Sequence, residues 1–174
     1  MRGAVYFGVA FLVCSASLAA QPQKDAYTST EGKYAIKFPN RPKTSHQIAK
    51  SALGDLDVNV ATYATGDANV FMVSYTDYPA AATKPENRKT LFDGIQDGIK
   101  GSKGEIVSEK AIEFGPEKLP GRELVVDRDK GKQRIKFRAV LRDNRLYQIA
   151  VIGTAEFVSG KDATAFFESL ELTK

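Results

Sequence analysis

The chain is poor in the residues on which many catalytic and metal sites depend. Its 174 residues include one cysteine, one histidine and no tryptophan. Zinc fingers, disulfide scaffolds and Cys–His nucleophilic pairs all need more of these residues than are present. No serine lies in a G-x-S-x-G elbow, and His46 alone would have to serve any Ser–His triad. We therefore expect a protein that is not an enzyme and that holds no metal or cofactor.

The chain also has little net charge of either sign. The 25 Lys and Arg residues exceed the 21 Asp and Glu residues by a net charge of +4. That excess is smaller than nucleic-acid-binding domains usually show. The hydrophobic share of 43% and the charged share of 26% are typical of soluble globular domains. The composition predicts one folded domain, a monomer, without a nucleic-acid partner.

Long apolar runs are absent, apart from a ten-residue run over Ala4–Val13. A membrane-spanning helix needs about 20 residues, so this run is too short to span a bilayer. Arg2 stands before it, and the small residues of Ser17–Ala20 follow it. Positive charge, short apolar run and small residues are the order of a secretory signal peptide. We predict a cleaved signal peptide over residues 1–20 and export to the periplasm or the outside of the cell.

The single cysteine, Cys14, lies inside this predicted signal. It could be a lipid-attachment site, but Val13 precedes it where bacterial lipoprotein signals usually carry a small residue. Otherwise the exported chain has no cysteine, which suits an oxidising compartment. After the signal we expect an N-terminal lead over residues 21–32 and a single domain over residues 33–174.

Apolar alternation predicts strands, and two segments have helical spacing instead. A Gly66–Asp67 turn joins two of the strands, and Gly101 and Gly104 end the first helix. Thr83 and Glu86 have the spacing of a capping box, and Ser159 is the expected N-cap of the second helix. The predicted strands cover residues 33–38, 56–60, 71–75, 105–114, 121–128, 133–142 and 145–153, and the predicted helices cover 83–99 and 161–170.

Two tight turns fix which residues face each other across the last strands. A loop at Lys130–Gly131 puts Asp127 opposite Arg134 and Glu123 opposite Arg138. A turn at Asp143–Asn144 continues the apolar face, with Leu141 opposite Leu146, Phe137 opposite Ala150 and Ile135 opposite Ile152. Opposed carboxylates therefore neutralise part of a stripe that would otherwise look like a basic binding face.

The strand over 145–153 is apolar on both sides, since Tyr147, Ile149 and Val151 alternate with a second apolar set. Such a strand must be covered on both faces. We therefore predict an α+β fold in which an antiparallel sheet of about six or seven strands is sandwiched between helices in three layers.

Five short phrases along the chain resemble the PsbP-like superfamily. They are Phe38–Pro42, Tyr75–Pro79, Leu119–Glu123, Arg145–Gln148 and Phe166–Leu170. Their order, together with hairpins, helix, antiparallel strands and terminal helix, is similar to that superfamily and to its uncharacterised exported bacterial branch. The resemblance implies an α/β/α sandwich, shared by an extrinsic photosystem subunit and a yeast Ran-binding import factor. Its members act mainly as assembly, docking or accessory proteins without catalysis.

Arg122 is the charged residue whose place in the pattern most needs a partner, because it shares a strand face with Leu124 and Val126. One interpretation is a structural ion pair with a helix carboxylate such as Glu168, and the other is a contact with an anion or a partner. His46, in a polar segment expected to form a surface strand, is either a solvated side chain or a binding residue. The further candidates for partner or anion contact are Arg134, Lys136 and Arg138.

Two functions from different classes remain open. The first is an exported accessory protein that docks on a protein or membrane-associated complex of the cell envelope, with peripheral membrane association as one form of docking. It would use a sheet edge, the Arg-rich strand, or the loops at 77–83 and 114–120. The second is a carrier of a small apolar or anionic ligand between sheet and helix, with Tyr63, Tyr75 or Tyr147 lining the pocket.

Overall fold

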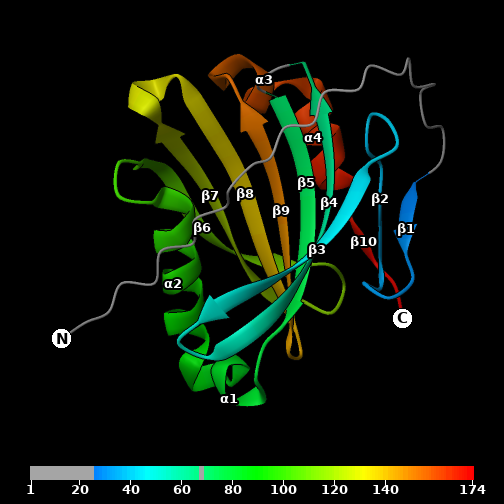
Figure 1. Ribbon diagram of the computed structural model, residues 1–174, viewed down its shortest axis with the longest axis vertical. Coiled ribbons are helices and arrows are strands. Elements are labelled where there is room, and N and C mark those ends of the chain that lie inside the picture. The colour runs from blue at the N-terminus through cyan, green and yellow to red at the C-terminus, as the bar shows by residue number, and fades with distance from the viewer. Residues whose placement is uncertain (1–25, 67–68) are drawn as a thin grey trace.

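A seven-stranded antiparallel sheet forms the centre of the computed structural model, which describes residues 26–66 and 69–174 (Figure 1). The strand order is β3-β4-β5-β9-β8-β7-β6, so β5 and β9 pair although they are distant in sequence. The strands are β3 (Lys43–Ser51), β4 (Gly54–Thr65), β5 (Asn69–Asp77), β6 (Glu105–Phe114), β7 (Leu119–Arg128), β8 (Gln133–Arg142) and β9 (Arg145–Gly153). The predicted signal peptide, with Cys14, lies outside the described residues.

The registers predicted from the two turns are confirmed. Across β7 and β8, Asp127 faces Arg134 and Glu123 faces Arg138. Across β8 and β9, Leu141 faces Leu146. The first turn is longer than expected, because Asp129–Gly131 forms a short 3₁₀ turn, η2, with both Asp129 and Lys130 at positive φ. The longer turn leaves the register unchanged.

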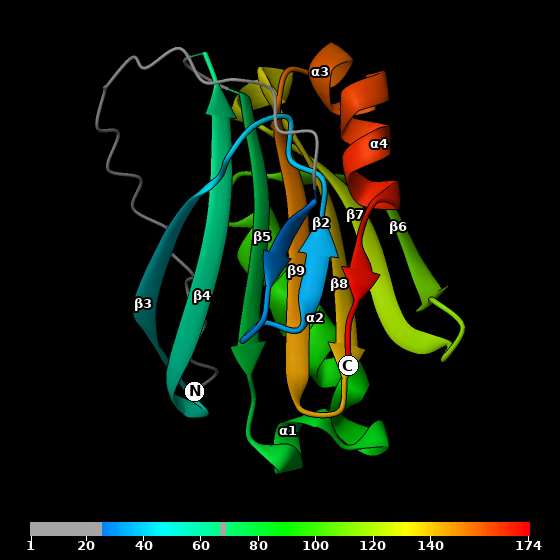
Figure 2. The ribbon, with the colours of Figure 1, turned by 90° about the vertical axis from the view of Figure 1, so that its right-hand side faces the viewer.

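Helices cover opposite faces of the sheet, which confirms the three predicted layers (Figures 1 and 2). On one face lies α2, preceded by the short α1 and a 3₁₀ turn, η1. On the other face lie α3 and α4. Their bounds are α1 (Ala80–Thr83), η1 (Pro85–Asn87), α2 (Arg88–Lys100), α3 (Ala155–Ser159) and α4 (Lys161–Glu168).

The two predicted N-caps are wrong, and each has a physical reason. The hydroxyl of Thr83 donates to the Asn144 side chain at 2.9 Å, and the main helix α2 begins only at Arg88. Ser159 ends α3 instead of starting α4, and its hydroxyl donates to the Ala155 carbonyl at 2.8 Å. The predicted helix end is confirmed, because Gly101 caps α2 with φ of 63°, a conformation that favours glycine.

A second, three-stranded sheet packs beside α4 in the order β1-β2-β10 (Figure 2). Its strands are β1 (Tyr27–Ser29), β2 (Tyr34–Ile36) and β10 (Glu171–Leu172). The predicted first strand at 33–38 therefore belongs to this small sheet, and β1 lies in what the sequence presents as a lead. The amide of Thr173 donates to the Lys33 carbonyl at 2.9 Å, which fastens the end of the chain to β2.

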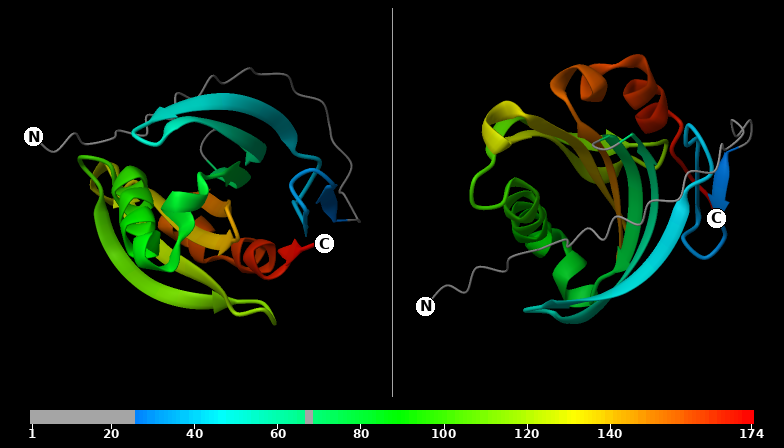
Figure 3. Two further views of the ribbon diagram at one scale, coloured as in Figure 1. Left: turned by 90° about the horizontal axis from the view of Figure 1, so that it is seen from below. Right: turned by 45° about the horizontal axis from the view of Figure 1, so that its top comes forward.

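Two apolar clusters fill the spaces on either side of the large sheet. The cluster on the α4 side also receives Tyr34 and Ile36 from the small sheet. On the other side the sheet curves around α2 (Figure 3), whose Leu91 and Phe92 pack on Leu124 and Leu146. Tyr147, Ile149 and Val151 lie in the first cluster while Leu146 and Ala150 lie in the second, so β9 is covered on both faces as predicted. In the part of the chain that the structure describes, no helix is long and apolar enough to cross a membrane.

Candidate functional site

Arg122 has partners inside the domain. Its Nη1 donates to Asp93 Oδ1 at 2.9 Å and to Gln96 Oε1 at 2.8 Å, both on α2, and lies 3.3 Å from Glu109 on β6. The guanidinium also lies 5.6 Å from the centre of the Phe92 ring. The predicted pairing of Arg122 with Glu168 is wrong, because the Arg122 side chain points toward α2, whereas Glu168 belongs to α4 on the opposite face of the sheet.

The basic residues on β8, Arg134, Lys136 and Arg138, also contact groups of their own domain. Arg134 donates to both oxygens of Asp127 at 2.6 and 2.7 Å, and these bonds hold the pKa of Asp127 below its usual value. Arg138 donates to Glu123 at 2.8 Å and to the Phe167 carbonyl at 3.0 Å. The ammonium of Lys136 lies 5.0 Å from the centre of the Phe167 ring. These cations fasten strands to each other and to α4.

His46 occupies a different environment, on the edge strand β3. Its side chain is 57% exposed, and Nε2 lies 3.1 Å from Asp57 Oδ1 on β4. Seven of the nine residues of β3 are exposed, including Ile48 at 62%. Beside it, Leu53 in the β3–β4 turn is 49% exposed. Of the sequence-predicted contact residues, His46 is the one whose strand presents an open edge.

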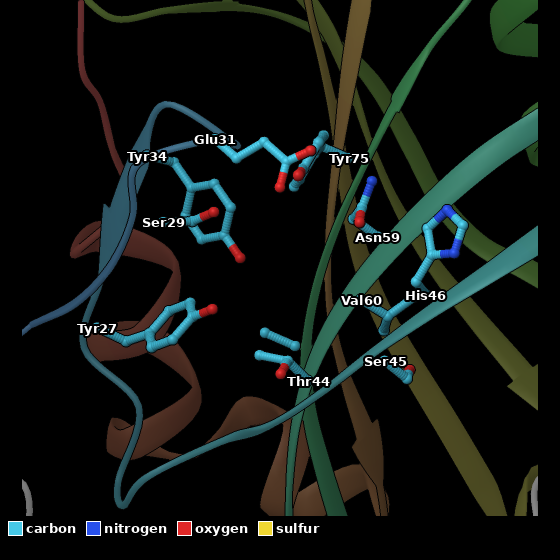
Figure 4. Close-up of a pocket in the computed structure, with 11 residues that line it drawn as sticks. Tyr27, Ser29, Glu31, Tyr34, Thr44, Ser45, His46, Asn59, Val60 and Tyr75 are labelled. Carbon is cyan, nitrogen blue, oxygen red and sulfur yellow. The ribbon is translucent and has the colours of Figure 1, made fainter.

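A cavity of about 350 Å³ lies between this edge and the small sheet (Figure 4). The register of β3, β4 and β5 places Thr44 beside Ala61, and His46 beside Asn59, which in turn faces Tyr75. From the small sheet, Figure 4 shows the hydroxyls of Tyr27 and Tyr34 pointing into the space. The full lining is Tyr27, Ser29, Glu31, Tyr34, Thr44, Ser45, His46, Asn59, Val60, Ala61 and Tyr75.

The three tyrosines predicted to line one pocket are separated. Tyr75 lines the cavity beside β3, and Tyr147 lines a second cavity of about 330 Å³ at the end of the sheet near Arg142. Tyr63 lines neither of the two, and packs against the α4-side cluster instead. Because the two apolar clusters fill the spaces between sheet and helices, both cavities lie away from the predicted location.

Arg145 lines the second cavity, contacts two residues that line the first, Glu31 and Tyr75, and was not singled out from the sequence. It donates to both oxygens of Asp77, at 2.7 and 2.6 Å, and to the Glu31 carbonyl at 2.6 Å. Its guanidinium lies 4.7 Å from the centre of the Tyr75 ring. These bonds lower the pKa of Asp77. The Asp77–Arg145 register joins β5 to β9 across 68 positions of sequence, so no turn in the sequence predicts it.

A solved structure shares this arrangement of elements. The solution structure of cyanobacterial PsbP (CyanoP) from Synechocystis sp. PCC 6803 matches with a TM-score of 0.60 over 92% of this chain and 98% of that chain, at 11% sequence identity. A crystal structure of a Pseudomonas aeruginosa protein of unknown function matches with a TM-score of 0.42, covering 65% of this chain and 85% of that chain at 12% identity. No protein-family model and no curated protein sequence matches this chain. The protein has a PsbP-like fold, as the resemblance in its sequence implied.

Proposed function

We propose that the protein is an exported, non-catalytic accessory protein that docks on a partner protein of the cell envelope through the edge strand β3. The observation that carries this proposal is the contrast between the two edges of the large sheet. An uncovered edge strand offers unpaired backbone groups to another chain, and native proteins usually protect such edges.

The β6 edge is protected in two ways. A register shift between Ile106 and Ser108 forms a bulge that interrupts its ladder with β7. Charged residues also stand along it, and Glu109 and Lys110 form ion pairs with β7. Both features disfavour the addition of a further strand.

The β3 edge has no bulge, and its centre carries no Lys, Arg, Asp or Glu. Its nine residues pair with β4 without a register shift, from Lys43 opposite Thr62 to Ser51 opposite Gly54. Its two lysines, Lys43 and Lys50, stand near the ends of the strand and form no ion pair among the described residues. Between them lies exposed Ile48. This edge fits an extended segment of a partner, with apolar or polar side chains at its centre and carboxylates near its ends.

The basic residues first considered for docking support the same location by elimination. Arg122, Arg134 and Arg138 bind carboxylates of their own domain, and the Lys136 ammonium lies over the Phe167 ring, so these residues offer less charge to a partner than their number suggests. Lys43 and Lys50 on β3 have no such contact among the described residues.

The test places a photo-crosslinking residue at position 48 and, in a matched protein, at position 107 on the opposite edge. Val107 is 51% exposed and apolar like Ile48, but it lies at the bulge of the protected edge, so the pair compares an open edge with a protected one. We expect a partner from native envelope extract to crosslink at 48 through an extended segment, and not at 107. The variant Ile48→Lys should lose this partner while Val107→Lys keeps it, and high salt should weaken the association. Equal capture by both positions, or binding that survives Ile48→Lys, would overturn the proposal.

A further inference from the structure

The cavity beside β3 has a chemical character of its own, set by tyrosines and one carboxylate. Tyr34 is 2% exposed and Tyr75 is 6% exposed, so both form its floor, while Tyr27 lies at its side. The ring centres of Tyr27 and Tyr34 are 6.1 Å apart, and those of Tyr34 and Tyr75 are 6.3 Å apart. The three phenols therefore form one continuous aromatic surface.

The phenols of Tyr34 and Tyr75 stay protonated and neutral. Burial raises the pKa of Tyr34 strongly, and burial together with the charge of Glu31 raises that of Tyr75. Each hydroxyl can thus accept a hydrogen bond as well as donate one. The electron-rich faces of aromatic rings also attract cations.

Glu31 supplies the only formal negative charge among the lining residues. Its carboxylate lies beside Tyr75 (Figure 4) and has no ion-pair partner among the described residues. The guanidinium of Arg145, the nearby cation, donates its hydrogen bonds to the Asp77 carboxylate and to the backbone carbonyl of Glu31. No Lys or Arg is among the described residues that line the cavity.

Acceptor groups without partners complete the lining. The side chains of Thr44 and Asn59 have no hydrogen-bond partner within residues 26–66 and 69–174. The ring of His46 is bonded through Nε2 to Oδ1 of Asp57. The cavity therefore combines one uncompensated carboxylate, several oxygen acceptors and aromatic rings.

We propose that this cavity is a binding site for a small organic cation, whose ammonium or guanidinium group meets Glu31 and the tyrosine hydroxyls. Its volume of about 350 Å³ lies at the small end of ligand sites, which span roughly 300 to 1,000 Å³. This ligand class differs from the apolar or anionic one expected from the sequence. The site stands whether or not β3 docks on a protein.

The test compares three four-carbon probes of similar shape and different charge: putrescine, 1,4-butanediol and succinate. Binding to the purified protein is measured by amide chemical shifts and by calorimetry at neutral pH. We expect putrescine to shift amides around Asn59 and Ala61, with an affinity at least about tenfold above that of butanediol. Succinate should leave those amides unshifted.

Variants then locate the site. We expect Glu31→Gln to weaken putrescine binding about tenfold and Tyr75→Phe about threefold. The matched control is Glu105→Gln, which removes the same charge from an exposed position on β6 and should leave the affinity within about twofold. Equal weakening by Glu31→Gln and Glu105→Gln would show general charge attraction and overturn the site. Binding of succinate or butanediol as tight as that of putrescine, or no putrescine binding at about 10 mM, would also overturn it.

Discussion

Reversal of the charge at Arg122 tests whether this residue serves the fold or a partner. Its side chain is 14% exposed and bonds Asp93 and Gln96 on α2. In Arg122→Glu a third carboxylate would join Asp93 and Glu109 in a nearly buried position. Breaking a buried pair so that a charge is left uncompensated costs about 3–5 kcal/mol, and we expect a loss in that range.

A smaller loss is expected for Arg122→Met, which keeps an unbranched apolar stem against Phe92. The carboxylates of Asp93 and Glu109 are 41% and 39% exposed, so water can replace the lost bonds. Exposed pairs contribute about 0.2–1 kcal/mol, and the contact with Phe92 about 0.5–1 kcal/mol. The neutral variant should therefore cost about 1–2 kcal/mol in total.

Urea unfolding followed by far-UV circular dichroism measures both losses, since the chain has no tryptophan. The double variant Arg122→Glu/Asp93→Lys should recover part of the stability, because it restores opposite charges across β7 and α2. Lys132→Glu makes the same charge change at an exposed turn and should stay within about 0.5 kcal/mol of the parent. If Arg122→Glu costs no more than Lys132→Glu, the structural interpretation of Arg122 is refuted.

Two further predictions concern the core and acid. Phe166 is 1% exposed, and its ring centre lies 5.0 Å from that of Phe38 and 5.1 Å from that of Phe71. Phe166→Ala should therefore lower the free energy of unfolding in urea by about 3–5 kcal/mol. A loss below about 1 kcal/mol would contradict this packing. Because arginine bonds lower the pKa of Asp77 and Asp127 from 3.8, their contribution to stability is present above that value and is lost as the pH falls through the folded-state pKa. The urea midpoint should drop on acidification below pH 3.8, less so in Asp77→Asn, and a flat profile would rule this out.

The sequence predicted the large sheet well where neighbouring strands are joined by tight turns. Alternation and the Asp143–Asn144 turn together leave one register for β8 and β9, since a slip of one residue would expose Ile149 or bury Arg138. Because Tyr147 and Leu146 are apolar and point to opposite faces of β9, the pattern predicts a covering layer on each face of the sheet. The three layers follow from local pattern alone.

The errors arise where residues distant in sequence compete for the same group. Thr83 had the spacing of a cap, but Asn144 from the β8–β9 turn takes its hydroxyl. Arg122 was placed on the correct face of its strand, yet no pattern tells which helix covers that face. The strands β1 and β10 have three and two residues, too few for any alternation to be recognised.

The candidate site was predicted less completely than the fold. His46 and its surface strand were recognised, but the cavity beside them combines residues from two sheets whose contact depends on tertiary packing. Tyr75 was included among the lining residues for its place on β5, whereas Tyr27, Glu31 and Tyr34 come from segments read as a lead and a first strand.

The small sheet also sets an order of events during synthesis. Its central strand β2 is made before all strands of the large sheet, but β10, which pairs Glu171 with Ala35, is made after every other described strand. Contacts of such large sequence separation raise the contact order and slow folding. Until Leu172 has been made, Tyr34 and Ile36 lack this neighbouring strand, so the small sheet can be completed only after all strands of the large sheet have been synthesised.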